Sequence, residues 1–326
     1  MSSSKAGQRE QVGAVSRYRA AMMACTALAI VAVDFAAFPR RFAKTETYGH
    51  SVVRATRTLA RSLAATDPCC THTRAQMDAG VGCFMFSAGI VARHVGSAAS
   101  VAQQLQRAVR SALPLLVLGA ARLVTTKAAQ YQEHVSEYGV HWNFFFTLGA
   151  VQLLLVLLRP PTAWSAAAAL AIAGAYQAAL SLLGLAEYIE HAPRETLLSM
   201  NKEGVCSSLG YVAIYLLGVQ LGHVLLRPRS VRQWRSLLVP MALLDAALWL
   251  ATNLLHHYVA PNSRRMANLT YVVFVAAYNL FALTGLLAID AFLPQYGSEL
   301  LVTAINRNGL AVFLVVRHAR THPRTL

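Results

Sequence analysis

Charged residues are scarce in this chain of 326 residues: they make up 13% of the sequence, whereas 56% of the residues are hydrophobic. The mean hydropathy is +0.44. A soluble domain of this length cannot hide so much apolar surface in one core, so a soluble globular protein is excluded. The composition indicates an integral membrane protein.

Acidic residues are few, with 14 Asp and Glu against 29 Lys and Arg. Most of these bases fall in short polar stretches beside apolar runs, where they anchor helix ends and attract anionic lipid headgroups. The formal charge of +15 comes without a basic stripe interleaved with aromatics on a polar scaffold. We therefore expect membrane lipids as partners and no nucleic acid.

Cysteine spacing gives no sign of a metal or disulfide framework. The chain has five cysteines, with neither a C-x-x-C pair nor the Cys/His spacing of a zinc site. No repeat with a period of 20 to 50 residues is present either, which argues against a solenoid. The sequence predicts no metal site and one helical bundle.

Apolar runs of spanning or nearly spanning length recur along the chain. They predict an all-α, polytopic transmembrane bundle of about nine spans. The runs cover about 20–38, 78–92, 112–126, 142–158, 163–186, 205–226, 236–255, 267–290 and 299–316.

Polar segments divide the rest of the chain. Residues 1–17 are rich in Ser, Gly and charge and predict a disordered tail, and residues 317–326 form a basic tail. The membrane domain is expected over 18–316. Within it, residues 53–76 are rich in Arg, Thr and Ala and cannot span, so we interpret them as an atypical loop.

Counting the spans assigns each connecting stretch to one side of the membrane. Connectors on the N-terminal side, including 93–111 and 227–235, hold bases, prolines and small residues. The dense polar motifs all fall on the other side, which is typical of a membrane enzyme or transporter with a one-sided cavity. Once residues 53–76 are set aside, the two sides carry comparable numbers of Lys and Arg, so the overall charge bias of the loops does not orient the chain. Only the compact arginine-rich stretch 227–235 favours a cytosolic N-terminal side, and the motif side is then lumenal.

Asp34 lies within the last turns of the first apolar run, and Lys44 follows ten residues later across Pro39. A carboxylate inside the hydrocarbon is costly and by default suggests a site. Asp34 can take a proton from an alcohol while Lys44 holds the developing charge. A structural salt bridge that caps a helix explains the same spacing equally well.

A second motif runs from Glu133 to Asn143. Its acids and His141 recur at i, i+4, so they share one helix face. His141 is a weaker candidate for a general base than Asp34. A metal site made by Glu133, Glu137 and His141, or hydrogen bonding at the lipid interface by His141 and Asn143, remain alternatives.

Three more features have simpler structural interpretations beside functional ones. Asn201 to Gly204 predict the start of a helix, with Glu203 near its positive end. Arg264 and Arg265 either clamp a phosphate or anchor a helix. Asp245 and Asp290 are predicted first as hydrogen-bond partners between helices. Gly218-x-x-x-Gly222 would allow two helices to approach closely, but the simpler interpretation is that its small residues merely pack the bundle.

Several long stretches of this sequence, in the same order along the chain, resemble one family. It is the inositol acyltransferase family of glycosylphosphatidylinositol (GPI) anchor synthesis. The resemblance covers about residues 17–316. The stretches that carry it are 33–49, 77–82, 131–146, 201–204 with 209–211, 263–269 and 304–308.

The resemblance implies a reaction and a place. The family transfers a fatty acyl chain, usually palmitoyl, from acyl-CoA to the inositol 2-hydroxyl of glucosaminyl-phosphatidylinositol in the endoplasmic reticulum membrane. Asp34 and Lys44 match its catalytic acidic and basic positions, and no cofactor is implied. Substrate contacts are expected from Arg40, Arg41, Glu133, Asn143, Asn201, Glu203, Arg264 and Arg265.

The sequence departs from the family pattern in three places. Family members carry further spans before the Asp34 region and more chain after the Asn306 region. Joining Val52 to Met77 restores the family's usual run, so residues 53–76 are expected to be an insertion. An unspliced intron or a faulty gene model explains all three departures. An inactive truncated homologue, a lipid transporter or a scaffold remain alternatives.

Overall fold

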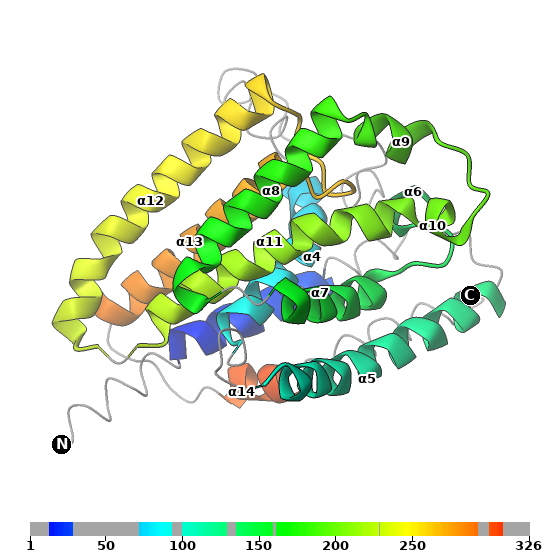
Figure 1. Ribbon diagram of the computed structural model, residues 1–326. Helices are drawn as coiled ribbons and strands as arrows, with labels where there is room; N and C mark the ends of the chain where they lie inside the picture. The colour runs from blue at the N-terminus through cyan, green and yellow to red at the C-terminus, as the bar shows by residue number, and fades with distance from the viewer. Residues whose placement is uncertain are drawn as a thin grey trace, which may run out of the picture. The chain divides into compact units, whose positions relative to one another are not determined.

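The computed structural model describes residues 13–28, 72–92, 100–128, 135–158, 161–227, 229–292 and 300–308, and every regular element in these ranges is a helix (Figure 1). The all-α prediction is therefore confirmed. In chain order the elements are a helix over 13–28, α4 (His72–Ile90), α5 (Val101–Ala128), α6 (Val135–Tyr138), α7 (Phe144–Leu158), the 3-10 turn η1 (Thr162–Trp164), α8 (Ser165–Leu182), α9 (Leu185–His191), α10 (Leu197–Met200), α11 (Lys202–Leu225), α12 (Val231–Tyr258), α13 (Leu269–Phe292) and α14 (Leu300–Arg307).

Five helical stretches are long and apolar enough to cross a membrane: Val101–Ala128, Thr162–Leu182, Lys202–Leu225, Arg232–Tyr258 and Leu269–Phe292. Two shorter apolar helices are Ala79–Ile90 and Phe144–Leu158. Large apolar side chains on α5 and α12, such as Val117 and Leu243, are exposed, as expected for surfaces that face lipid. The protein is thus multi-spanning, and the described residues do not confirm the count of about nine.

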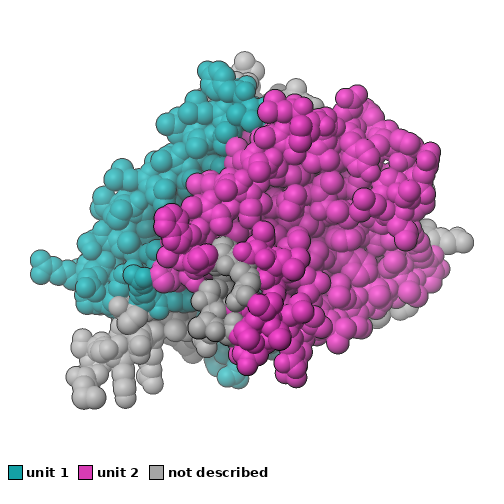
Figure 2. Space-filling model, in the orientation of Figure 1, with its two compact units in different colours: residues 1–84, 224–262, 273–326 teal, residues 85–223, 263–272 magenta. Residues whose placement is uncertain are grey.

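The chain divides into two compact units, which Figure 2 colours separately. Unit 1 consists of Met1–Phe84, Val224–Asn262 and Val273–Leu326. Unit 2 consists of Met85–His223 and Ser263–Val272.

Glycines bring α4 and α11 into close contact within unit 2. A Cβ atom built on Gly218 would lie 2.2 Å from the Phe86 carbonyl oxygen, and one on Gly222 would lie 2.2 Å from that of Ile90. Residue numbers rise together along both helices, so these helices run parallel. The small residues of Gly218-x-x-x-Gly222 thus pack directly against the backbone of α4.

Helix directions agree with the alternation that the span count requires. The parallel pair α4 and α11 belongs to the second and sixth predicted runs. The pair α5 and α7 runs antiparallel, because Ser111 bonds Gln152 while Asn143 bonds the Gly119 carbonyl 2.9 Å away. These two helices belong to consecutive runs, as the alternation demands.

We expect Gly218→Leu to lower the free energy of unfolding by about 3 kcal/mol, because overpacking forces two helix backbones apart. Chemical unfolding in detergent micelles measures this. Gly174→Leu is the matched control, since nothing lies within 4 Å of a Cβ atom on Gly174 in α8. Equal stability of the two variants would show that the α4–α11 contact is absent.

Unit 1 pairs α12 with α13 in antiparallel order. The Trp249 and Phe274 rings lie 5.8 Å apart near one end, and Arg235 bonds the Ala291 carbonyl at the other. Asp290 forms an ion pair with Arg17, which confirms its prediction as an inter-helix partner. For Asp245 the prediction is not confirmed, since its buried Oδ1 has no hydrogen-bond partner among the described residues.

Three predicted boundaries need correction. Residues 13–17, assigned to the disordered tail, are helical, because Ala14 is fully buried and the Arg17 charge is neutralised by Asp290. Residues 101–111, assigned to a connector, form the first turns of α5, and most of the polar side chains there are exposed. α4 begins at His72, inside the stretch interpreted as an atypical loop. Residues 1–12 and 309–326 lie outside the described ranges.

Candidate functional site

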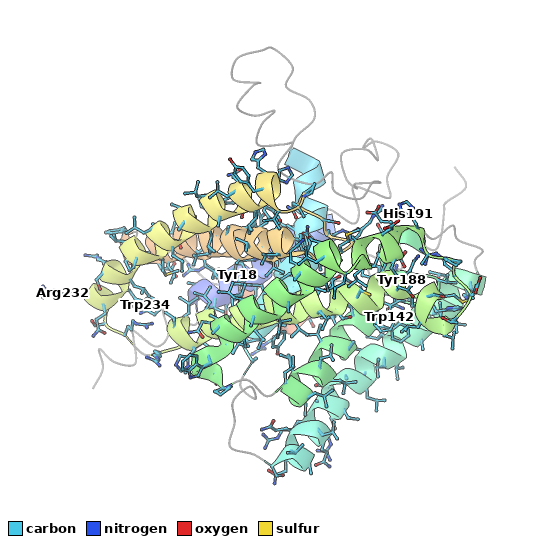
Figure 3. The ribbon with its side chains drawn as sticks, turned by 45° about the horizontal axis from the view of Figure 1, so that its top comes forward. Tyr18, Trp142, Tyr188, His191, Arg232 and Trp234 are labelled. Atoms are coloured by element: carbon cyan, nitrogen blue, oxygen red, sulfur yellow. The ribbon has the colours of Figure 1, made fainter. Side chains whose placement is uncertain are left out.

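Three loop segments of unit 2 are linked, the second and third each contacting the first, and each leads directly into a long helix. Residues 137–143 precede α7, residues 194–201 precede α11 and residues 263–268 precede α13. They carry three of the motifs on which the family resemblance rests. Figure 3 labels Trp142, Tyr188 and His191 in this region.

The first contact joins the loop at Gly139 to the start of α11. The Val140 amide donates to the Met200 carbonyl (2.9 Å), and the His141 amide donates to Oδ1 of Asn201 (2.8 Å). Gly139 has φ of +114°, and a Cβ atom there would lie 2.6 Å from the Cα of Asn201. Only glycine combines this backbone conformation with such a close approach.

Trp142 and Asn143 fix the rest of that loop. A Cβ atom on Gly204 would lie 2.2 Å from Cδ1 of Trp142, so the indole lies directly on the first turn of α11. Trp142 Nε1 donates to Thr147 (2.9 Å). Asn143 caps α7, since its Oδ1 accepts from the Phe145 amide (3.0 Å), while its Nδ2 donates to Gly119 of α5.

Buried charges hold the start of α11. Glu203 is 1% exposed and accepts from both terminal nitrogens of Arg194, which also donates to the Met200 carbonyl (3.1 Å). Lys202 is 2% exposed and donates to the Tyr188 and Ala192 carbonyls (3.0 and 2.5 Å), the carbonyl end of α9. Each charge therefore meets an opposite charge or a helix end of opposite sign.

The third segment joins through Arg264. Its Nη2 lies 3.1 Å from Oε1 of Glu137. Asn268 caps α13 by accepting from the Tyr271 amide (3.1 Å), and Tyr176 of α8 donates to the Met266 carbonyl (2.8 Å). We call the three segments with these contacts the polar module. Backbone and side-chain hydrogen bonds and the Glu137–Arg264 ion pair connect its segments.

The structure brings together five of the predicted site residues: His141, Asn143, Asn201, Glu203 and Arg264. Arg265, 6% exposed, lies in the same segment as Arg264. The prediction of a helix start at Asn201 to Gly204 is confirmed, with Glu203 in the first turn of α11. Nδ1 of His141 is buried and has no hydrogen-bond partner among the described residues.

The remaining predicted residues lie outside the described ranges. They are Asp34, Arg40, Arg41, Lys44 and Glu133. Their roles stay predictions, as do the substrate contacts of the residues in the polar module. Within the ranges that the structure covers, no three or more His, Cys, Asp or Glu side chains are placed to hold a metal ion.

Sequence reasoning missed two residues of the module, Arg194 and Lys202. Arg194 stands in a short polar stretch, where a lone arginine resembles any surface residue. Lys202 falls at the start of an apolar run, where snorkelling to the interface is the usual role. The only available signal was a pair of unlike charges, Lys202 and Glu203, at a helix start.

The comparisons with known proteins agree on one family. The GWT1 family profile matches residues 1–54 and 69–316. The phosphatidylinositol-glycan biosynthesis class W protein of Dictyostelium discoideum is 34% identical over 345 residues, covering 93% of this chain and 65% of that protein. GPI-anchored wall transfer protein 1 of Gibberella zeae is 36% identical over 345 residues, covering 92% of this chain and 64% of that protein.

A bovine relative has the most explicit name. Glucosaminyl-phosphatidylinositol-acyltransferase PIGW of Bos taurus is 38% identical over 297 residues, covering 88% of this chain and 54% of that protein. The chain thus spans less than two thirds of the length of these relatives. The profile match leaves out only residues 55–68 between its two matched stretches. On this match over most of its length, the chain belongs to the GWT1 family.

Proposed function

We propose that this chain transfers a fatty acyl group from acyl-CoA to the inositol 2-hydroxyl of glucosaminyl-phosphatidylinositol, a step of GPI-anchor synthesis. The observation that carries the proposal is the similarity to the bovine acyltransferase, at 38% identity over 88% of this chain. Palmitoyl-CoA is the expected co-substrate, and the reaction needs no bound cofactor.

In this mechanism the Asp34 carboxylate takes the proton of the inositol hydroxyl. The oxygen then attacks the thioester carbonyl carbon, and Lys44 stabilises the negative charge that develops on the carbonyl oxygen. The new C–O bond forms as the C–S bond breaks, and the CoA thiolate receives the proton from Asp34. Arg40 and Arg41 follow Asp34 closely in sequence and are proposed to bind the substrate phosphate.

The polar module supports this proposal in two ways. Three helices begin at it, and helix N-termini favour negative charge such as a phosphate or a developing oxyanion. His141 also has a buried Nδ1 without a partner among the described residues, so it is the module's candidate for a proton acceptor. Glu203 and Arg264 already contact Arg194 and Glu137, so we propose that they position the loops.

We further propose about nine spans in the endoplasmic reticulum membrane, with the polar module on the lumenal side. The alternation of the predicted spans and the arginines at 227–235 support this side assignment. We also propose that residues 53–76 are an insertion, which the gap in the family match at 55–68 supports. A continuous coding transcript across Val53–Gln76 would make the segment genuine.

Cells that lack their own inositol acyltransferase test the function. Expression of this chain should restore acylated glucosaminyl-phosphatidylinositol, measured by lipid mass spectrometry. Asp34→Asn and Lys44→Ala should each lose at least 99% of the product at unchanged protein level, if each removes about 10²-fold or more in rate.

Matched controls come from the same chain. Asp67→Asn changes a carboxylate in the proposed insertion, and Lys127→Ala changes an exposed lysine at the end of α5. Both should keep normal product. Wild-type turnover in Asp34→Asn and Lys44→Ala would overturn the mechanism. Rescue by the bovine relative but not by this chain would favour an inactive homologue, a transporter or a scaffold.

A further inference from the structure

Arginines gather at one end of unit 1, and none of them belongs to the proposed acyl-transfer site. Contacts between elements define this end. Arg235 donates through Nε and Nη2 to the Ala291 carbonyl (3.1 and 2.9 Å), which joins the first turn of α12 to the last turn of α13. Arg17 pairs with Asp290 on the same turn of α13. The start of helix 13–28 therefore lies there too.

Two further contacts complete this end. Asn306 Nδ2 donates to the Ser16 carbonyl (2.8 Å), which places the C-terminal turn of α14 beside the start of helix 13–28. Arg229 donates to the Val224 carbonyl, and its guanidinium lies 5.0 Å from the centre of the Trp234 ring. Figure 3 shows Trp234 near Arg232 at the start of α12.

The charge at this end is strongly one-sided. Its arginines, which we call the arginine rim, are Arg17, Arg227, Arg229, Arg232, Arg235 and Arg307. Asp290 is the only Asp or Glu within the described residues 13–28, 224–235, 286–292 and 300–308. The six arginines of the rim outnumber this carboxylate, so the described part of this end carries a net positive charge that attracts anions.

The level of the rim in the membrane indicates which anions it binds. Arg232 and Phe292 are the end residues of two candidate spans, and spans end at the level of the lipid headgroups. Arg229 and Arg235 lie against the rings of Trp234 and Phe292, an aromatic and basic pairing typical of the membrane interface. Arg227, Arg232 and Arg307 are exposed. Guanidinium groups bind phosphate through paired N–H donors.

We propose that the arginine rim binds the phosphate groups of anionic glycerophospholipids in the leaflet that it faces. This inference is independent of the acyl transfer, because it uses no residue of the proposed site. It assigns the rim a selective lipid partner, beyond general anchoring of the helices. The proposal requires anionic lipid to be enriched around the rim over zwitterionic lipid.

Fluorescence quenching tests this. The purified chain is placed in phosphatidylcholine liposomes that contain an equal, low mole fraction of either brominated phosphatidylserine or brominated phosphatidylcholine. The quenching of Trp234 is obtained by subtracting the signal of Trp234→Phe. The brominated anionic lipid should quench more strongly, and its relative affinity should fall about fivefold for each exposed arginine removed. Raising the salt concentration should weaken the preference.

Arg232→Gln and the triple variant Arg227→Gln, Arg232→Gln, Arg307→Gln remove exposed charges without touching the helix-end contacts of Arg229 and Arg235. Lys127→Gln, an exposed base on α5 of unit 2, is the matched control and should keep the wild-type preference. Equal quenching by the two lipids in the wild type would overturn the proposal. So would an unchanged preference in the triple variant, or an equal loss in Lys127→Gln.

Discussion

Glu203→Leu is expected to lower the free energy of unfolding by about 3 kcal/mol, near the lower end for removing one partner of a buried ion pair. The Glu203 side chain has no exposed surface, whereas that of Arg194 is 29% exposed, so water relieves part of the unpaired charge. The change should also weaken the hydrogen bond from Arg194 to the Met200 carbonyl. The loop at His141, which is bonded to the same segment, should then become less well held. Chemical unfolding in detergent micelles measures the stability, and a product assay measures the activity.

The control for this prediction is Glu195→Leu, because Glu195 is an exposed acid in the same segment. It should change stability by less than about 0.5 kcal/mol. The double variant Arg194→Met, Glu203→Leu should be more stable than either single variant, since no buried charge is left unpaired. If Glu203→Leu abolished activity at wild-type stability while Arg194→Met left activity intact, Glu203 would be a substrate-binding residue instead.

Gly139→Ala is expected to lower the free energy of unfolding by about 3 kcal/mol and to reduce acyl transfer at least tenfold. Two causes add: a residue with a Cβ atom at φ of +114° is strained by about 1–3 kcal/mol, and that atom would meet the backbone of Asn201. The loop must move, which breaks the Val140–Met200 and His141–Asn201 hydrogen bonds. Thermal unfolding and the product assay on the same preparation measure both effects.

Gly184→Ala is the control for Gly139→Ala, because it measures the cost of backbone strain without a steric clash. Gly184 also has positive φ, at +68°, but nothing lies within 4 Å of a Cβ atom there. This control should cost only about 1 kcal/mol. Equal effects at the two glycines would mean that the contact between the His141 loop and α11 contributes nothing to stability.

Apolar periodicity predicted the helices well because each apolar run needs a continuous helix in lipid. α13 begins at Leu269, within two residues of its predicted run. α5 begins eleven residues early, at Val101, because its first turns carry polar side chains that an apolar window rejects. The polar start of helix 13–28 was missed for the same reason, since pairing with Asp290 removes the cost of Arg17.

The candidate site was only partly predictable. Span counting placed the motifs of His141, Asn201 and Arg264 on one side, and the structure brings them into contact. Arg194 and Lys202 were not predicted as part of the site, because their partners are determined by tertiary packing. These partners are Glu203 and the carbonyl end of α9. Asp34 and Lys44 remain predictions, since residues 29–71 lie outside the described ranges.

The most direct test of the central claim is a cell-free acyl transfer assay. The purified chain in liposomes is given glucosaminyl-phosphatidylinositol and palmitoyl-CoA, and free CoA thiol and lipid products are measured together. The account predicts one inositol-acylated lipid for each CoA released, and loss of both in Asp34→Asn. Release of CoA without acylated lipid, or no turnover in an assay where the bovine relative is active, would contradict it.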